Sequence, residues 1–227
     1  MIIAVIPARS GSKGIKDKNI INYQGKPLIA WTIEQGLSSK HKPRVIVSTD
    51  SNEYANIALQ YGAEIPYIRP PEISQDLSTD YEFIKHMIDM LKLNDDDIIV
   101  HLRPTSPSRT TKQIDEAIDM FLKYKDTYTS LRSVVKVEKS PYKMYTMNNN
   151  TLKPLFSDLG DIKEPYNKPR QILPDCYIHN GYIDIIKVST IMAGSVTGTK
   201  ILPFVMNYKE TLDIDTISDL VSETKPV

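Results

Sequence analysis

The chain has 227 residues, 41% hydrophobic and 25% charged, a composition that indicates a folded globular protein and excludes a disordered or fibrous chain. Its 28 Lys and Arg residues balance 28 Asp and Glu residues, so no overall basic field exists to attract nucleic acid. The single cysteine, Cys176, cannot form an internal disulfide, and the apolar run at residues 2–7 is too short for a signal or membrane segment, so we expect a cytoplasmic protein without membrane association.

Strands and helices are predicted to alternate over the first half of the chain. Runs of β-branched residues at 2–6, 45–47 and 98–100 are apolar on both faces, which is typical of buried parallel strands. Helices are predicted at residues 28–37, 52–61, 79–93 and 110–122, the last two beginning with capping-box spacing. This alternation predicts an α/β fold, with a doubly wound sheet covered by helices on both faces.

The pattern changes after about residue 126. Further strands are predicted at residues 130–137, 143–147, 177–186 and 200–205. A polar, proline-containing stretch separates the second of these strands from the third. We therefore expect a single domain over residues 1–227, with a small lobe inserted at roughly residues 135–175.

A basic, glycine-containing loop follows the first predicted strand. Residues 7–19 combine Gly11 and Gly14 with cationic side chains that include Arg9, Lys13 and Lys18. Such a loop can surround phosphate oxygens with backbone N–H groups and positive charges, so it is a candidate triphosphate site. It matches neither the P-loop nor the dinucleotide fingerprint. A basic surface loop with ordinary turn glycines is the alternative.

A second polar loop follows the third predicted strand. In it, Arg103, Thr105 and Ser106 are flanked by Pro104 and Pro107, which restrict the backbone. In open α/β sheets ligands bind beyond the carboxyl ends of the strands, and both loops leave strands at that end. The alternative is a proline-containing loop that only leads into a helix.

Near the end of the sequence, Asp213 and Asp215 alternate with apolar residues. In an extended segment both carboxylates would point to one face, as a Mg²⁺ site beside a phosphate requires. Asp215 could equally be a helix N-cap.

Arg170, in a proline-containing loop, could bind a carboxylate or phosphate or could be merely exposed. The four histidines lack metal-ligand spacing, and nothing supports covalent catalysis.

Taken together, these motifs resemble the acylneuraminate (sialic acid and related nonulosonate) cytidylyltransferase family over nearly the whole chain. The resemblance implies a Rossmann-like nucleotidyltransferase fold whose small lobe makes a dimer. The matching segments are residues 6–15 with Lys18 and Asn19, 46–50, Arg69 and Pro70 with Asp76, 103–107, 141–143, 169–171 with Leu173 and Pro174, 180–181 and 213–216.

The resemblance also implies an activity. In this family CMP is transferred from CTP to the anomeric hydroxyl of a nonulosonic acid, such as sialic, legionaminic or pseudaminic acid, with Mg²⁺ and with release of pyrophosphate. The residues that this implies as catalytic are Arg9, Lys18, Asp213 and Asp215, of which Asp213 and Asp215 would hold the metal. The implied nucleotide site contains Arg9, Ser10, Gly11, Ser12, Lys18, Asn19, Arg69, Asp80 and Arg103. The implied sugar site contains Lys143, Arg170, Gln171 and Asn180, in part from the second subunit of a homodimer with shared sites.

The sequence departs from the family pattern at three places. Arg103 stands where the family usually has Gln, and Asp80 stands near its usual small or hydroxyl residue. Residues 180–184 are Asn-Gly-Tyr-Ile-Asp where the family more often has Asn-Gly-Ala-Ile-Tyr, so Tyr182 and Asp184 both depart from it, which would alter the sugar pocket. Two alternative functions remain open: a nucleotidyltransferase for another acid sugar, such as Kdo, or for another nucleotide, and a catalytically silent nucleotide-binding protein.

Overall fold

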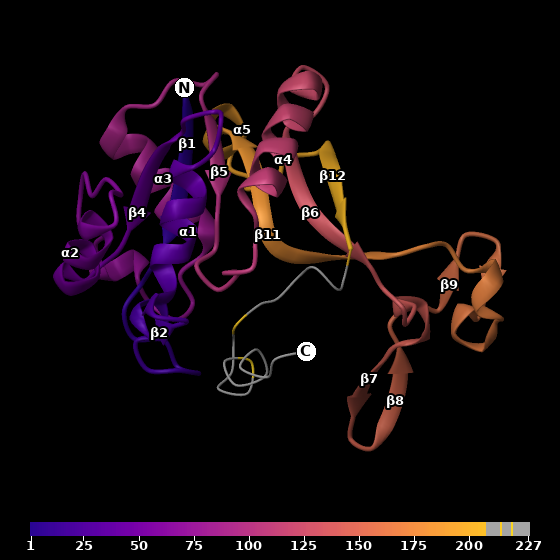
Figure 1. The fold of residues 1–227 in the computed structure, drawn as a ribbon. Helices are drawn as coiled ribbons and strands as arrows, with labels where there is room; N and C mark the ends of the chain where they lie inside the picture. Colours follow the sequence, from indigo (N-terminus) through magenta and orange to yellow (C-terminus); the bar gives the residue numbers. More distant parts are fainter. Residues whose placement is uncertain (208–213, 215–218, 220–227) are drawn as a thin grey trace.

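A computed structural model describes residues 1–207, Ile214 and Asp219. Its centre is a six-stranded sheet with the order β12-β6-β11-β5-β1-β4 (Figure 1). Only β11 runs opposite to the other five strands. The mostly parallel α/β sheet predicted from the sequence is therefore confirmed. Its strands are β1 Ile2–Pro7, β4 Arg44–Ser48, β5 Ile98–His101, β6 Ser130–Lys136, β11 Tyr177–Lys187 and β12 Ile201–Met206.

Helices cover both faces of the sheet, as the apolar strands require. Along β1, Ala4 and Ile6 pack on one face, against α1, α2 and α4. Ile3 and Val5 pack on the opposite face, against α3 and α5. This alternation buries both sides of the central strand, so the sheet is doubly wound. The helices are α1 Leu28–Leu37, α2 Asn52–Gln60, α3 Asp80–Leu91, α4 Thr111–Tyr124 and α5 Val188–Met192.

The four predicted helices are confirmed, and two of them begin at the predicted capping boxes. The Thr79 hydroxyl and the Glu82 carboxylate form the box that opens α3. Thr110 and Gln113 form the corresponding box at the start of α4. The five-residue helix α5 was not predicted, because so short a segment has too few positions to show a helical period. None of the helices among the described residues is both long and apolar enough to cross a membrane.

Residues between β6 and β11 form an arm that projects from the sheet (Figure 1). Side chains of Met144, Met147, Leu152 and Leu155 on this arm are between 43% and 72% exposed. So many exposed apolar side chains on one small segment are typical of a protein interaction surface. The arm contains the 3₁₀ helices η3 Pro141–Lys143, η4 Pro165–Asn167 and η5 Arg170–Ile172, and the strands β7 Tyr145–Asn148, β8 Thr151–Pro154, β9 Asp158–Leu159 and β10 Ile162–Lys163.

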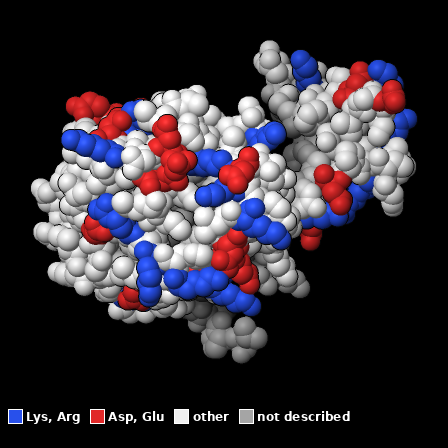
Figure 2. Space-filling view, turned by 90° about the horizontal axis from the view of Figure 1, so that it is seen from above, with Lys and Arg blue, Asp and Glu red and all other residues white. Residues whose placement is uncertain are grey.

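Short elements outside the sheet complete the fold. Asn22–Tyr23 and Lys26–Pro27 form the small hairpin β2–β3, which leads directly into α1. Two more 3₁₀ helices are η1 Lys18–Ile20, between β1 and β2, and η2 Pro71–Ile73, between α2 and α3. Basic and acidic side chains are interspersed over the face shown in Figure 2, as expected for a chain with zero net charge.

Candidate nucleotide-binding site

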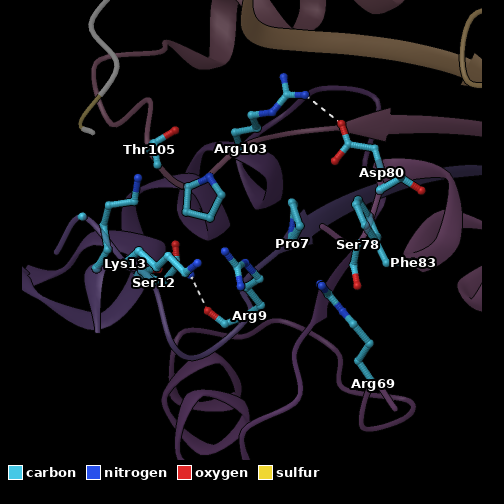
Figure 3. Close-up of a pocket in the computed structure, with 15 residues that line it drawn as sticks. Pro7, Arg9, Ser12, Lys13, Arg69, Ser78, Asp80, Phe83, Arg103 and Thr105 are labelled. Atoms are coloured by element: carbon cyan, nitrogen blue, oxygen red, sulfur yellow. Dashed lines mark hydrogen bonds and ion pairs between the residues drawn. The ribbon is translucent and has the colours of Figure 1, made fainter. Parts of the chain in front are cut away.

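A cavity of about 460 Å³ lies at the carboxyl ends of β1 and β5 (Figure 3). The basic loop after β1 and the proline-containing loop after β5 both border it, as expected for ligand loops in an α/β sheet. The segment that begins α3 closes the cavity from another side. The lining residues are Pro7, Arg9, Ser12, Lys13, Gly14, Lys18, Asn19, Arg69, Ser78, Thr79, Asp80, Phe83, Arg103, Pro104 and Thr105.

The basic loop is fixed by hydrogen bonds at its base. The backbone N–H and the hydroxyl of Ser10 both donate to the Asp50 carboxylate, at 2.7 and 2.8 Å. The side-chain amide of Asn19 donates to the Arg9 carbonyl at 3.0 Å. Gly11 has a φ of +73°, a conformation that favours glycine, so the chain can reverse here. Ser10 and Gly11 therefore shape the loop. Neither of them is one of the residues that line the cavity.

Three cationic side chains of this loop border the cavity. Arg9 donates to one oxygen of the Asp76 carboxylate at 2.9 Å, and the Lys13 ammonium lies 2.5 Å from the other oxygen. The hydrogen bonds from Lys13 and Arg9 lower the pKa of Asp76, so this carboxylate stays ionised. With Lys18 also on the wall, the loop concentrates positive charge as a polyphosphate site requires.

A fourth cation, Arg69, approaches from the segment between α2 and α3. Its side chain donates through Nε to the Ser48 hydroxyl at 3.1 Å and also donates to the Ser48 carbonyl. The guanidinium lies 4.9 Å from the centroid of the Phe83 ring, a cation–π distance. Arg69 is 4% exposed, and burial lowers the pKa of its guanidinium. These contacts hold Arg69 in one orientation at the cavity wall.

The end of the cavity away from the basic loop carries an acidic side chain paired with a basic one. There Arg103 donates to the Asp80 carboxylate at 2.8 Å, and Figure 3 places this pair away from Ser12 and Lys13. The other side of the Arg103 guanidinium faces Asp184, with 3.5 Å between the nearest atoms. The three departures from the family pattern thus lie together and contact one another through Arg103.

Arg109, which the sequence analysis did not single out, holds the loop after β5 from beneath. It is 2% exposed and donates to the carbonyls of Tyr182 and Arg103, at 2.8 and 3.2 Å, and to the Thr32 hydroxyl, at 2.9 Å. It therefore joins α1, β11 and the cavity loop. Burial lowers its pKa to about 9, so the guanidinium is still charged at neutral pH.

His101, the last residue of β5, is buried against the edge of the Phe83 ring, with 5.5 Å between ring centroids. Neither of its ring nitrogens has a hydrogen-bond partner among the described residues. Burial, followed by the nearby charge of Arg103, lowers the pKa of His101 to about 4 from 6.5. The folded protein therefore holds His101 neutral at pH 7.

This burial predicts a loss of stability in mild acid. Below about pH 6.5 the unfolded chain protonates His101 while the folded chain does not, so the free energy of unfolding should fall as the pH drops from 6.5 to 4. A shift of this size corresponds to roughly 3 kcal/mol at most. Urea unfolding across this range should show a shallower pH dependence for His101→Phe. Equal slopes for the two proteins would contradict the neutral, buried state of His101.

Ile214 connects the end of the sequence to the site. Its backbone N–H donates to the carbonyl of Thr105, a cavity residue, at 2.8 Å. Its side chain is fully buried with Ile15, Tyr23 and Leu28. Asp213 and Asp215, the predicted metal ligands on either side of it in the sequence, lie outside the described residues.

The predicted sugar-binding residues are not brought into this cavity within one chain. Lys143, Arg170 and Gln171 lie on the arm, where the Lys143 ammonium donates to the Tyr166 carbonyl at 3.4 Å. Asn180 lies in β11 and accepts a hydrogen bond from the Ser133 hydroxyl at 2.6 Å. In a single subunit the structure therefore joins the predicted nucleotide residues but leaves the arm residues apart.

Sequence reasoning did not include Asp50 or Asp184 among the site residues. A signal for Asp184 exists, because it is a charged residue within the otherwise apolar end of β11. Asp50 lies two residues after the end of β4, at the edge where ligands bind. The helical spacing of apolar residues predicts only that Phe83 is a core residue of an amphipathic helix. Its contact with Arg69 could not be predicted from that spacing.

Comparison with known proteins agrees with the site. Residues 3–161 match the model of the family described as cytidylyltransferase. The chain is 37% identical over 229 residues to CMP-N,N'-diacetyllegionaminic acid synthase from Legionella pneumophila, covering 96% of this chain and 92% of that protein. It is 36% identical over 217 residues to N-acylneuraminate cytidylyltransferase from Escherichia coli O18:K1:H7, covering 94% of this chain. It spans only about half (49%) of that relative's length.

A solved structure with the same fold is CMP:2-keto-3-deoxy-manno-octonic acid synthetase complexed with CTP. It has a TM-score of 0.68 and 16% identity, and the match covers 98% of this chain and 96% of that one. At this identity the likeness shows the fold, and the family assignment comes from the sequence matches. The chain belongs to the cytidylyltransferase family, among the acylneuraminate cytidylyltransferases that its motifs resemble.

Proposed function

We propose that this protein transfers CMP from CTP to the anomeric hydroxyl of a nonulosonic acid and releases pyrophosphate. The observation that carries the proposal is the cavity at the strand ends, where Arg9, Lys13, Lys18 and Arg69 converge in a chain of the cytidylyltransferase family. The names of its relatives indicate legionaminic acid and sialic acid as the first sugars to test.

The side chains at the cationic end suit a CTP triphosphate. In the proposed reaction the oxygen of the anomeric hydroxyl attacks the α-phosphorus, the bond from that phosphorus to the pyrophosphate oxygen breaks, and the hydroxyl proton is released. Arg9 and Lys18 would neutralise the charge that develops on the departing pyrophosphate. The fixed orientations of Arg69 and of the loop held by Asp50 favour such a reaction, since positioning supplies much of the catalysis when the protein forms no covalent bond.

Mg²⁺ is the proposed metal, with Asp213 and Asp215 as its ligands. Two carboxylates are suitable donors for Mg²⁺, which also takes oxygen ligands from substrate phosphates. Ile214 lies between them in the sequence, and its backbone N–H donates a hydrogen bond to the carbonyl of the cavity residue Thr105. This contact supports a role for the segment at the site. When bound, the ion would neutralise phosphate charge in the transition state.

We further propose a homodimer in which the arm completes the site of the second subunit. Two features of the arm support this arrangement. Lys143 and Arg170, predicted to reach the sugar acid or phosphates, lie on the arm and outside the cavity of their own chain. Met147 and Leu152, at the tip of the β7–β8 hairpin, are exposed apolar side chains of the kind that a subunit interface covers.

A cytoplasmic location stays a prediction from the single cysteine.

Shared sites predict complementation between two inactive variants. Arg170→Ala alters the arm and Asp213→Asn alters the main domain, so a mixed dimer has one site with both defects and one with neither. Random exchange in an equal mixture gives about half mixed dimers and about a quarter of wild-type activity. Native mass spectrometry would establish that exchange has occurred. No recovery of activity after exchange would contradict the shared site, while the enzyme assignment would stand.

The activity itself is tested by measuring pyrophosphate release with CTP and Mg²⁺, with and without each of several nonulosonic acids. We expect release that requires both CTP and a sugar acid. Kdo, and then UTP, GTP or ATP in place of CTP, test the alternative substrates. Binding of CTP without release in the presence of any acid would instead identify a catalytically silent protein.

A further inference from the structure

Arg103 lies between two carboxylates at the end of the cavity opposite the cationic loop. Its Nη2 donates to Asp80 at 2.8 Å, and its Nη1 lies 3.5 Å from Asp184. The Arg103 side chain is 27% exposed and that of Asp80 is 38% exposed, so both can still be reached from the cavity. Asp184, by contrast, is 3% exposed and lies beneath the pair.

Asp184 is itself held from several directions. His179 Nε2 is within 2.9 and 3.0 Å of its two oxygens, and Arg132 Nε is 3.3 Å from one of them. His101 lies next to this group, 3.9 Å from Asp80. Burial opposes ionisation of Asp184, but the hydrogen bond from His179 and the nearby positive charges outweigh it and lower the pKa of this carboxyl. Asp184 is therefore a fixed anion below Arg103.

Gly181 completes this support. It has a φ of +71°, and a Cβ at this position would lie only 2.7 Å from Arg103 Nη1. A larger residue would therefore displace the guanidinium. The bulge of β11, between His179 and Asp184, brings both Gly181 and Asp184 up to Arg103. The backbone and the charges of β11 thus hold Arg103 in one place.

This arrangement decides which chemical group fits here. The carboxylates of Asp80 and Asp184 balance the guanidinium charges of Arg103 and Arg132, so a ligand carboxylate or phosphate finds no net positive charge here and meets the negative charge of Asp80. What remains at the wall is an N–H donor of Arg103 beside a carboxylate acceptor of Asp80. A neutral group with one donor and one acceptor side by side matches that pair.

We propose that the Arg103–Asp80 pair is a specificity-determining element that recognises a neutral, amide-like donor–acceptor group of a substrate, with Asp184 as its positioning residue. The proposal rests on the proposed function. Two substrates carry such a group: the amino and ring-nitrogen edge of cytosine, and an acetamido substituent of the sugar acid. The same chemistry serves for both, and the experiment distinguishes them.

The experiment measures two ratios of kcat/KM in the wild type, Asp80→Asn and Asp184→Asn. The first compares CTP with UTP at saturating sugar acid. The second compares an acetamido sugar acid with its analogue carrying a hydroxyl at that position, at saturating CTP. We expect at least one ratio to fall by about tenfold in both variants. The ratio that falls identifies the group that is recognised. The matched control is Asp119→Asn. Asp119 lies on α4 and forms an exposed ion pair with Lys40, so its substitution should change neither ratio.

The positioning role of Asp184 has a separate readout. In an Arg103→Gln background, where no guanidinium needs compensation, Asp184→Asn should leave both ratios unchanged. Ratios equal to those of the wild type in active, folded Asp80→Asn and Asp184→Asn variants would overturn the proposal. So would an effect of Asp184→Asn that persists without Arg103. If the wild type releases no pyrophosphate with any substrate, the proposed function itself fails, which is a different result.

Discussion

Asp213→Asn and Asp215→Asn are each expected to lower turnover by at least about a thousandfold while leaving the midpoint of thermal unfolding nearly unchanged. Charge stabilisation by a bound metal commonly amounts to several kcal/mol, and each 1.4 kcal/mol changes a rate tenfold. Asparagine keeps the size of the side chain and removes the negative charge, so packing should survive. Steady-state rates of pyrophosphate release at increasing Mg²⁺ would measure the effect.

Asp126→Asn, which changes an exposed carboxylate after α4, is the matched control and should retain wild-type turnover. Direct binding of Mg²⁺ in the presence of CTP, measured by calorimetry, gives a second readout that does not depend on turnover. Near-normal turnover of either variant at saturating Mg²⁺ would remove that aspartate from the metal site.

The second large effect concerns stability. Arg109→Ala is expected to lower the free energy of unfolding by about 3 to 5 kcal/mol. It would remove the hydrogen bonds that the buried guanidinium donates to the carbonyls of Arg103 and Tyr182 and to the Thr32 hydroxyl, at ~1–3 kcal/mol each, and would also open a cavity. Arg109→Lys should recover only part of the loss, because an ammonium cannot span the same three acceptors.

Denaturant unfolding of these variants, compared with Arg44→Ala, would test this expectation. Arg44 also donates hydrogen bonds from its guanidinium, through Nε and Nη2 to the Glu64 carboxylate, but this pair lies at the surface, where it contributes about 1 kcal/mol or less. A cost for Arg109→Ala no larger than that for Arg44→Ala would contradict the bridging role of Arg109.

Most of the sheet and its helices could be predicted because their signals are local. The β-branched runs of β1, β4 and β5 are apolar on both faces, and α4 repeats apolar residues at helical spacing behind a capping box. Each signal lies within about 15 residues of sequence. The direction of β11 carries no such signal, because an antiparallel central strand and a parallel one can have the same apolar pattern.

The site was predictable only in part, for a physical reason. Arg9 and Lys18 lie in a loop whose composition already indicates phosphate binding. The partners that orient the site are distant in sequence: Asp50 is 40 residues from Ser10, and Asp184 is 81 residues from Arg103. Such contacts follow from the order and register of the strands, which local patterns do not specify. The sequence did show that Arg103, Asp80 and Asp184 are unusual, but their contact appears only in the fold.

Identification of the product tests the central claim most directly. The protein is incubated with CTP, Mg²⁺ and N,N'-diacetyllegionaminic acid or N-acetylneuraminic acid, and the mixture is analysed by mass spectrometry and ³¹P NMR. The account predicts a CMP–sugar acid conjugate and pyrophosphate in equal amounts, formed only when all components are present. Consumption of CTP to free CMP or CDP without a conjugate, or no consumption with any sugar acid of this class, would contradict it.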